Sequence, residues 1–64
     1  MDPRLRELRA KIRAERPFIR VKPYSHNIVR LCLCEIRQKF GLATANKAVR
    51  DLELTPLGYN EESE

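Results

Sequence analysis

The hydrophobic positions of the chain fall into three stretches with helical spacing. The first covers residues 2–16, where Asp2 suits the N-cap, Pro3 suits the first helical position and Pro17 stops the helix. Its apolar residues recur every three or four positions and predict a narrow apolar stripe made of Leu5, Leu8 and Ile12. Three residues are too few for firm insertion into a membrane surface.

Two further helices are predicted on either side of Gly41. One begins at Ser25, a favoured N-cap, and runs to Phe40, where Gly41 supplies the left-handed residue that ends it. Its main apolar face consists of Val29, Cys32, Leu33, Ile36 and Phe40, with Leu31 and Cys34 on the other side. A helix with apolar residues on more than one side is expected to be central in the fold or buried against a partner. The next helix covers about residues 42–52.

The segment between Pro17 and Pro23 cannot continue a helix, because each proline pushes the residue before it toward extended geometry. Ile19 and Val21 alternate there with other residues, so a short strand or extended arm is predicted at 18–22. The expected fold is therefore mainly α, with three helices, a central helix pair around Gly41 and this one extended segment. We expect a single small domain over residues 1–60 and a disordered acidic tail over 61–64.

A chain of 64 residues is expected to be only marginally stable unless a disulfide, a bound metal or a second copy of the chain stabilises it. Cys32 and Cys34 are two apart on a helix, so they point to nearly opposite faces and cannot pair or share a metal. His26 alone remains as a further ligand of that kind, and we therefore expect no metal and no cofactor. A homodimer becomes the expected form, with an interface drawn from Leu5, Leu8, Ile12, Leu31 and Cys34.

The sequence lacks the features expected of a membrane protein, a secreted protein or an enzyme. No stretch is apolar enough to span a bilayer, the N-terminal residues do not resemble a signal peptide, and free thiols suit a reducing compartment. These features predict a cytoplasmic protein without a membrane role. Capping explains Ser25 and exposure explains His26, and there is no glycine-rich phosphate loop or paired-carboxylate motif, so we expect no enzyme.

The net charge of +4 conceals an asymmetry along the chain. Residues 1–22 carry eight Lys or Arg against three acids and residues 23–50 carry five against one, whereas residues 51–64 carry five acids and no base. A basic body suits a polyanion, because each neutralised phosphate releases counterions. The alternative is that the charges only solubilise a small domain, with the acidic tail folded over them.

Two segments resemble ribbon-helix-helix DNA-binding proteins over residues 18–53. Residues 40–50 (FGLATANKAVR) are similar to the turn and second helix of that family, and residues 18–22 (FIRVK) are similar to its strand. The resemblance implies a dimer whose paired strands enter the major groove of DNA. On that basis Phe18, Arg20 and Lys22 would face the groove, Ile19 and Val21 would face the core, and the amides near Thr44 and Ala45 would hold a phosphate.

The expected function is thus a small, basic, non-catalytic and regulatory protein that binds nucleic acid, DNA in preference to RNA. The cations expected to make the contact are Arg6, Arg9, Arg13, Arg16, Arg20 and Lys22. An unclassified three-helix domain that docks its first helix on nucleic acid is an open alternative to the ribbon. A second alternative is an adaptor or modulator that binds a partner protein through its helical apolar surface.

Overall fold

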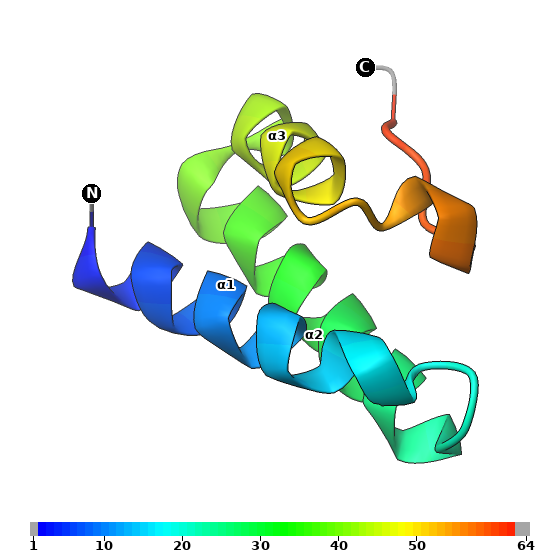
Figure 1. Ribbon diagram of the computed structural model, residues 1–64. Helices are drawn as coiled ribbons and strands as arrows, with labels where there is room; N and C mark the ends of the chain where they lie inside the picture. The colour runs from blue at the N-terminus through cyan, green and yellow to red at the C-terminus, as the bar shows by residue number, and fades with distance from the viewer. Residues whose placement is uncertain (1, 63–64) are drawn as a thin grey trace.

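Three α-helices make up most of residues 2–62, the part of the chain that the computed structural model describes (Figure 1). Helix α1 covers Pro3–Glu15, α2 covers Pro23–Phe40 and α3 covers Leu42–Asp51. Short 3-10 turns follow α1 and α3, at η1 (Arg16–Phe18) and η2 (Thr55–Leu57). The mainly α fold with a helix pair around Gly41 is therefore confirmed.

Helix α1 begins where the sequence predicts. The Asp2 side chain accepts hydrogen bonds from the backbone amides of Arg4 (2.8 Å) and Leu5 (3.4 Å), and Pro3 occupies the first turn. The helix ends at Glu15. The Arg16 amide still donates to the Ile12 carbonyl, but Pro17 has no amide hydrogen with which to continue the pattern.

Residues 18–22 do not form the predicted strand or extended arm. The backbone amides of Val21 (2.9 Å) and Lys22 (2.7 Å) both donate to the carbonyl of Phe18, which closes the segment into a turn. The prediction was wrong because this segment has to reverse the chain between two antiparallel helices. Val21 is 75% exposed and does not face the core, whereas Ile19 packs against it.

Helix α2 starts two residues earlier than predicted, at Pro23, a residue that is well suited to a first helical turn. Ser25 is therefore not its N-cap. The Ser25 side chain is fully buried, and its hydroxyl donates a hydrogen bond of 2.8 Å to the carboxylate of Glu15. This bond joins the end of α1 to the start of α2.

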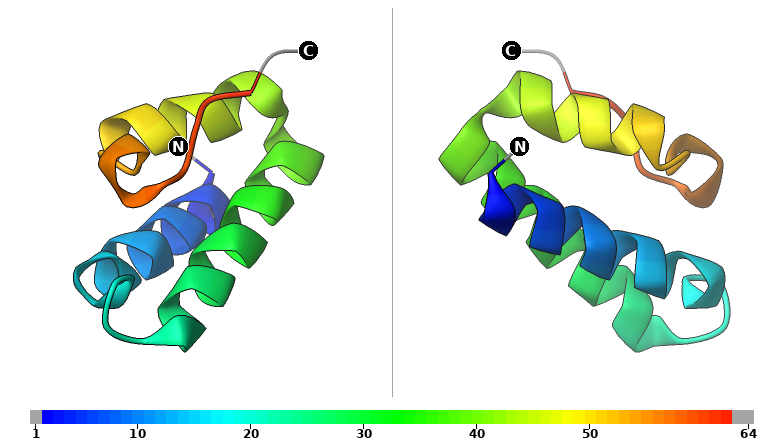
Figure 2. Two further views of the ribbon diagram at one scale, coloured as in Figure 1. Left: turned by 90° about the vertical axis from the view of Figure 1, so that its right-hand side faces the viewer. Right: turned by 60° about the vertical axis from the view of Figure 1, so that its left-hand side comes forward.

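The helices α1 and α2 lie side by side and run in opposite directions (Figure 2). Glu15, at the end of α1, meets Ser25 near the start of α2, while Arg4, at the start of α1, meets Glu35 in the second half of α2. Helix α3 crosses this pair, and the C-terminal segment runs back beside α3 toward the turn at Gly41 (Figure 2).

Gly41 joins α2 to α3 with a backbone conformation that suits glycine alone. Its φ of 96° and ψ of 163° place it in a region that side-chain-bearing residues hardly populate. The amide of Gly41 donates to the Arg37 carbonyl, and the Gly41 carbonyl accepts from the Ala45 amide. One residue therefore serves the end of one helix and the start of the next.

The three helices and the C-terminal segment share one hydrophobic core. Its buried members are Leu8, Ile12, Val29, Cys32, Ile36, Ala45, Ala48, Val49, Leu52, Leu54 and Tyr59. Leu5 is partly buried and packs against this core. The stripe of α1 is therefore used inside the chain, which corrects the prediction that Leu5, Leu8 and Ile12 form a dimer or partner interface.

A pair of leucine substitutions tests this core. Leu54 is fully buried and Leu31 is 70% exposed, so the same change should have very different effects. We expect Leu54→Ala to lower the free energy of unfolding by about 2–5 kcal/mol because it leaves a cavity. Leu31→Ala should change it by less than about 0.5 kcal/mol. Urea titration followed by circular dichroism measures both, and equal losses would contradict the described packing.

Candidate functional site

Arg16, predicted to contact nucleic acid, makes its contacts within the chain at the end of α3. Its Nε donates to the Leu52 carbonyl (2.9 Å) and its Nη2 donates to the Glu53 carbonyl (3.3 Å). Its guanidinium also lies 3.6 Å from the Glu53 carboxylate. Carbonyls at a helix C-terminus lack helical partners and carry partial negative charge, so a cation is favourable there.

Arg9 and Arg20 also have partners within the chain. Arg9 Nη2 lies 3.1 Å from Asp51 Oδ2, and the Arg9 side chain is only 15% exposed. The hydrogen bond from Arg9 is the main reason why the pKa of Asp51 lies below its ordinary value. Arg20 Nη2 donates to the Pro56 carbonyl (2.8 Å). Arg9 is therefore held against the last residue of α3, and Arg20 is held against the 3-10 turn that follows α3.

Arg6 and Arg13 point outward from α1. Both residues are exposed, and no carboxylate of residues 2–62 lies within ion-pairing distance of either. They are seven positions apart, so they lie on the same helix face about 10 Å apart along its axis. Lys22, in the turn after α1, has its ammonium 4.6 Å from the centre of the Phe18 ring.

Ion pairing leaves the positive charge unevenly distributed. Carboxylates of the described chain pair with Arg4, Arg9, Arg16, Arg37, Lys39, Lys47 and Arg50. Within residues 2–62, the Lys and Arg residues without such a partner are Arg6, Lys11, Arg13, Arg20, Lys22 and Arg30. All of these except Arg30 belong to α1 or to the turn that follows it.

Leu31 and Cys34, the other residues predicted for a dimer or partner interface, lie on the exposed side of α2. The Leu31 side chain is 70% exposed, and Cys34 is a free, exposed thiol. Neither joins the core, so both are available to a partner. The homodimer remains a prediction.

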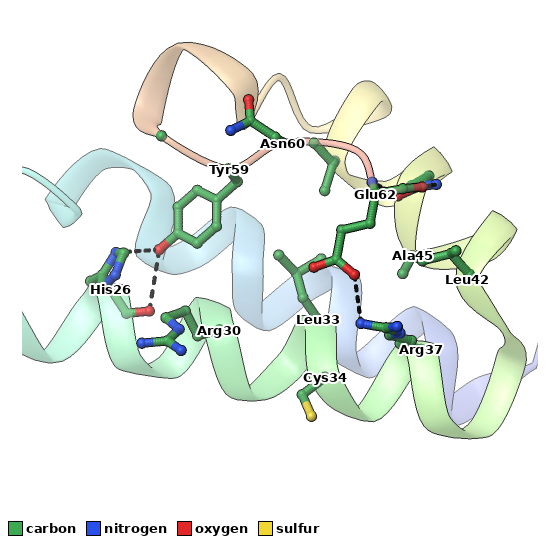
Figure 3. A pocket seen from close by; sticks show the side chains of 13 residues that line it. His26, Arg30, Leu33, Cys34, Arg37, Leu42, Ala45, Tyr59, Asn60 and Glu62 are labelled. Carbon is green, nitrogen blue, oxygen red and sulfur yellow. Dashed lines mark hydrogen bonds and ion pairs between the residues drawn. The ribbon is translucent and has the colours of Figure 1, made fainter. Parts of the chain in front are cut away.

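A groove lies between α2, α3 and the C-terminal segment (Figure 3). It has a volume of about 510 Å³, and Leu33, Ala45 and Val49 supply apolar parts of its lining. Arg30 and Arg37 line it from positions two turns apart on α2. The groove therefore combines an apolar wall with two guanidinium groups, and sequence reasoning did not identify it.

Tyr59 anchors one end of the C-terminal segment over this groove (Figure 3). Its hydroxyl lies 2.7 Å from Nδ1 of His26 and donates to the His26 carbonyl at 3.2 Å. Burial raises the pKa of Tyr59 above its ordinary value. Tyr59 is a buried member of the core, and its hydroxyl joins the core to the start of α2.

Glu62 anchors the other end. Its backbone amide donates to Asn46 Oδ1 (2.8 Å), and its carbonyl accepts from Asn46 Nδ2 (2.8 Å). Its carboxylate pairs with Arg37, and the neighbouring Glu61 lies 3.7 Å from Arg50. The first two residues of the predicted acidic tail thus contact α2 and α3, while Ser63 and Glu64 lie outside the described residues.

Arg4 and Glu35 form the most complete ion pair between α1 and α2. Arg4 Nε and Nη2 donate to the two Glu35 carboxylate oxygens at 2.6 Å and 2.9 Å. Lys39 adds a contact of 3.2 Å. The hydrogen bond from Arg4 is the largest cause that lowers the pKa of Glu35 from 4.5 to about 2.

This shift predicts a pH dependence of stability. Because the folded-state pKa is the lower one, the Glu35 carboxylate stabilises the fold above pH 4.5, and this stabilisation is lost as the pH falls toward about 2. We expect Glu35→Gln to lower the melting temperature at pH 7 and to have progressively less effect below pH 4.5. Thermal melts of both proteins across this range measure it. A constant difference would contradict the assignment.

The two thiols should differ in reactivity. Cys32 is buried, which raises the pKa of its thiol, whereas Cys34 is exposed. We expect a disulfide-exchange reagent such as Ellman's reagent to modify Cys34 rapidly in the folded chain and Cys32 only after unfolding. Cys34→Ser should abolish the rapid phase and Cys32→Ser should retain it. A rapid phase that survives Cys34→Ser would contradict the burial of Cys32.

The residues considered for catalysis are either used by the fold or lie apart. The Ser25 hydroxyl is committed to Glu15, and the ring of His26 is committed to Tyr59. Within residues 2–62, no group of three His, Cys, Asp or Glu side chains is placed to hold a metal ion. In the same residues, no helix has the length and apolar character needed to cross a membrane.

Comparison of the chain with protein-family models, curated proteins and solved structures finds no match.

Proposed function

We propose that this protein binds duplex DNA without catalysis, through the cations of α1 and of the turn that follows it. The observation that carries this proposal is the position of the Lys and Arg residues that lack a carboxylate partner within residues 2–62. They cluster between residues 6 and 22, with Arg30 as the exception. Such charges attract the phosphate backbone and release its counterions.

Within this surface, Arg6 and Arg13 are the principal contacts. They are exposed, share one helix face and are carried by a rigid helix, so guanidinium groups meet phosphates without prior breakage of an ion pair. Arg9 and Arg16 have a secondary role, because DNA contact would compete with Asp51 and Glu53. This is the docking of the first helix, and it needs no β-ribbon.

Exposed aromatic rings beside the same cations favour single-stranded nucleic acid as a second candidate ligand. Tyr24 is 79% exposed and Phe18 is 41% exposed, and both lie at the end of the helical hairpin that carries Arg20 and Lys22. Bases of a single strand stack on exposed rings while cations follow the backbone. Tyr24→Ala should weaken the binding of single strands and leave duplex binding unchanged.

The proposal is tested with Arg6→Gln/Arg13→Gln and a labelled random duplex of about 20 base pairs over a salt series. We expect affinity to fall and the slope of log K against log salt to decrease by about two, one for each lost phosphate contact. Fluorescence anisotropy measures both quantities.

The matched control is Arg37→Gln/Arg50→Gln, which removes the same charge from arginines that already pair with Glu62 and Glu61. It should leave the salt slope nearly unchanged. Equal effects of the two double variants would show diffuse attraction, and no duplex binding at low salt would reject the proposal.

A further inference from the structure

The C-terminal segment forms one wall of the groove and contacts α2 and α3 in the way that a bound peptide would. Asn46 makes two hydrogen bonds of 2.8 Å to Glu62, one to its amide and one to its carbonyl. Both involve only the main chain of Glu62, so any residue except proline would satisfy them at that position. An asparagine side chain that pairs with an extended backbone is a sequence-independent means of holding a peptide.

The charges at the groove favour an acidic peptide. Arg37 pairs with Glu62, and Arg50 pairs with Glu61. All four of these side chains are at least 45% exposed, so water and salt screen both pairs. The segment is therefore held by contacts of the right chemistry but of low individual strength, which another acidic chain can replace.

One cation of the groove is not used by the chain's own segment. Arg30 lines the groove and has no carboxylate partner within residues 2–62. It lies two helical turns from Arg37, about 10 Å along α2, which is the length of about three residues of extended chain. The residues of the C-terminal segment that line the groove before Glu61 are Gly58, Tyr59 and Asn60, none of which carries a carboxylate.

We propose that the groove between α2 and α3 binds an extended acidic segment of a partner protein, and that residues 60–62 occupy the same position within the chain. The partner segment pairs its backbone with Asn46 and places two carboxylates about three residues apart, against Arg37 and Arg30. This proposal does not rest on DNA binding, because no residue of α1 lines the groove.

A partner protein fits better than a second copy of this chain. In the register of the chain's own tail, a second copy would offer the same Asn60, Glu61 and Glu62, and would again leave Arg30 without a carboxylate. Its tail would also compete with the chain's own tail, which the covalent connection keeps at a high effective concentration. A partner with an additional acid gains a contact that the tail does not make.

The test uses the full chain and a fluorescein-labelled peptide, Gly-Glu-Asn-Glu-Glu-Gly, with the Gln-substituted peptide Gly-Gln-Asn-Gln-Gln-Gly as its uncharged counterpart. We expect Glu62→Gln to raise affinity for the acidic peptide by roughly twofold to fivefold, because it weakens the competing pair with Arg37. In that background, Arg30→Gln should reverse the gain, and the uncharged peptide should not bind measurably.

The matched control is Arg13→Gln, which removes the same charge from α1 and should change peptide affinity by less than about twofold. Circular dichroism melts establish that each variant folds. In a nuclear magnetic resonance titration, the side-chain amide of Asn46 should shift when peptide is added. Shifts confined to α1, or equal losses from Arg30→Gln and Arg13→Gln, would overturn the proposal.

Two further outcomes would reassign the groove. A sedimentation dimer that dissociates on Asn46→Ala would show that the occupant is the tail of a second copy. If the acidic peptide fails to bind while Arg30→Gln weakens duplex binding as much as Arg13→Gln does, then the groove belongs to a nucleic-acid surface. Either result would overturn the partner-peptide proposal.

Discussion

The structure depends on the burial of a very narrow apolar stripe. Helix α1 contributes only Leu8 and Ile12 in full to the core, with Leu5 at its edge. A helix with so few apolar positions cannot cover both the core and a partner. Apart from Pro3, Ala10 and Ala14, its other positions are charged, and the arginines that flank the stripe are positioned by it.

Each arginine's position relative to that stripe determines its role. Arg9 and Arg16 lie beside it on the helical projection, so they reach the end of α3 and pair with Asp51 and the Leu52 carbonyl. Arg6 and Arg13 lie farther round the helix and meet solvent. A row that is uniform in the sequence thus divides into cations with structural partners and cations exposed to solvent.

The helices were predictable because their boundaries rest on local chemistry. Asp2, Pro3 and Gly41 act through their own backbone or nearest amides, and the sequence predicts their effects correctly. Residues 18–22 were mispredicted because five alternating residues are too few to distinguish a strand from a turn, and chain reversal decided the outcome.

The groove could not be predicted, because its parts meet only in three dimensions. Asn46 reads as one polar position on the outer face of α3, and nothing near it in the sequence identifies Glu62 as its partner. The run of acids at the C-terminus was the only available signal, since a basic body invites an acidic tail to fold back. It indicates that the tail is attracted to the basic body, but it does not indicate where on that body the tail binds.

The placement of the tail also gives the molecule its electrical asymmetry. Glu61 and Glu62 pair with cations of α2 and α3. Asp51 pairs with Arg9 of α1, and Glu53 pairs with Arg16, which directly follows α1. The remaining positive charge therefore lies mainly along the outer side of α1 and in the turn that follows it. The two proposed ligands would therefore use different cations: the duplex would use unpaired cations of α1, and the acidic peptide would use Arg30 together with Arg37, which pairs with Glu62. An acidic partner would have to compete with the chain's own tail for Arg37, whereas a nucleic acid on α1 would not.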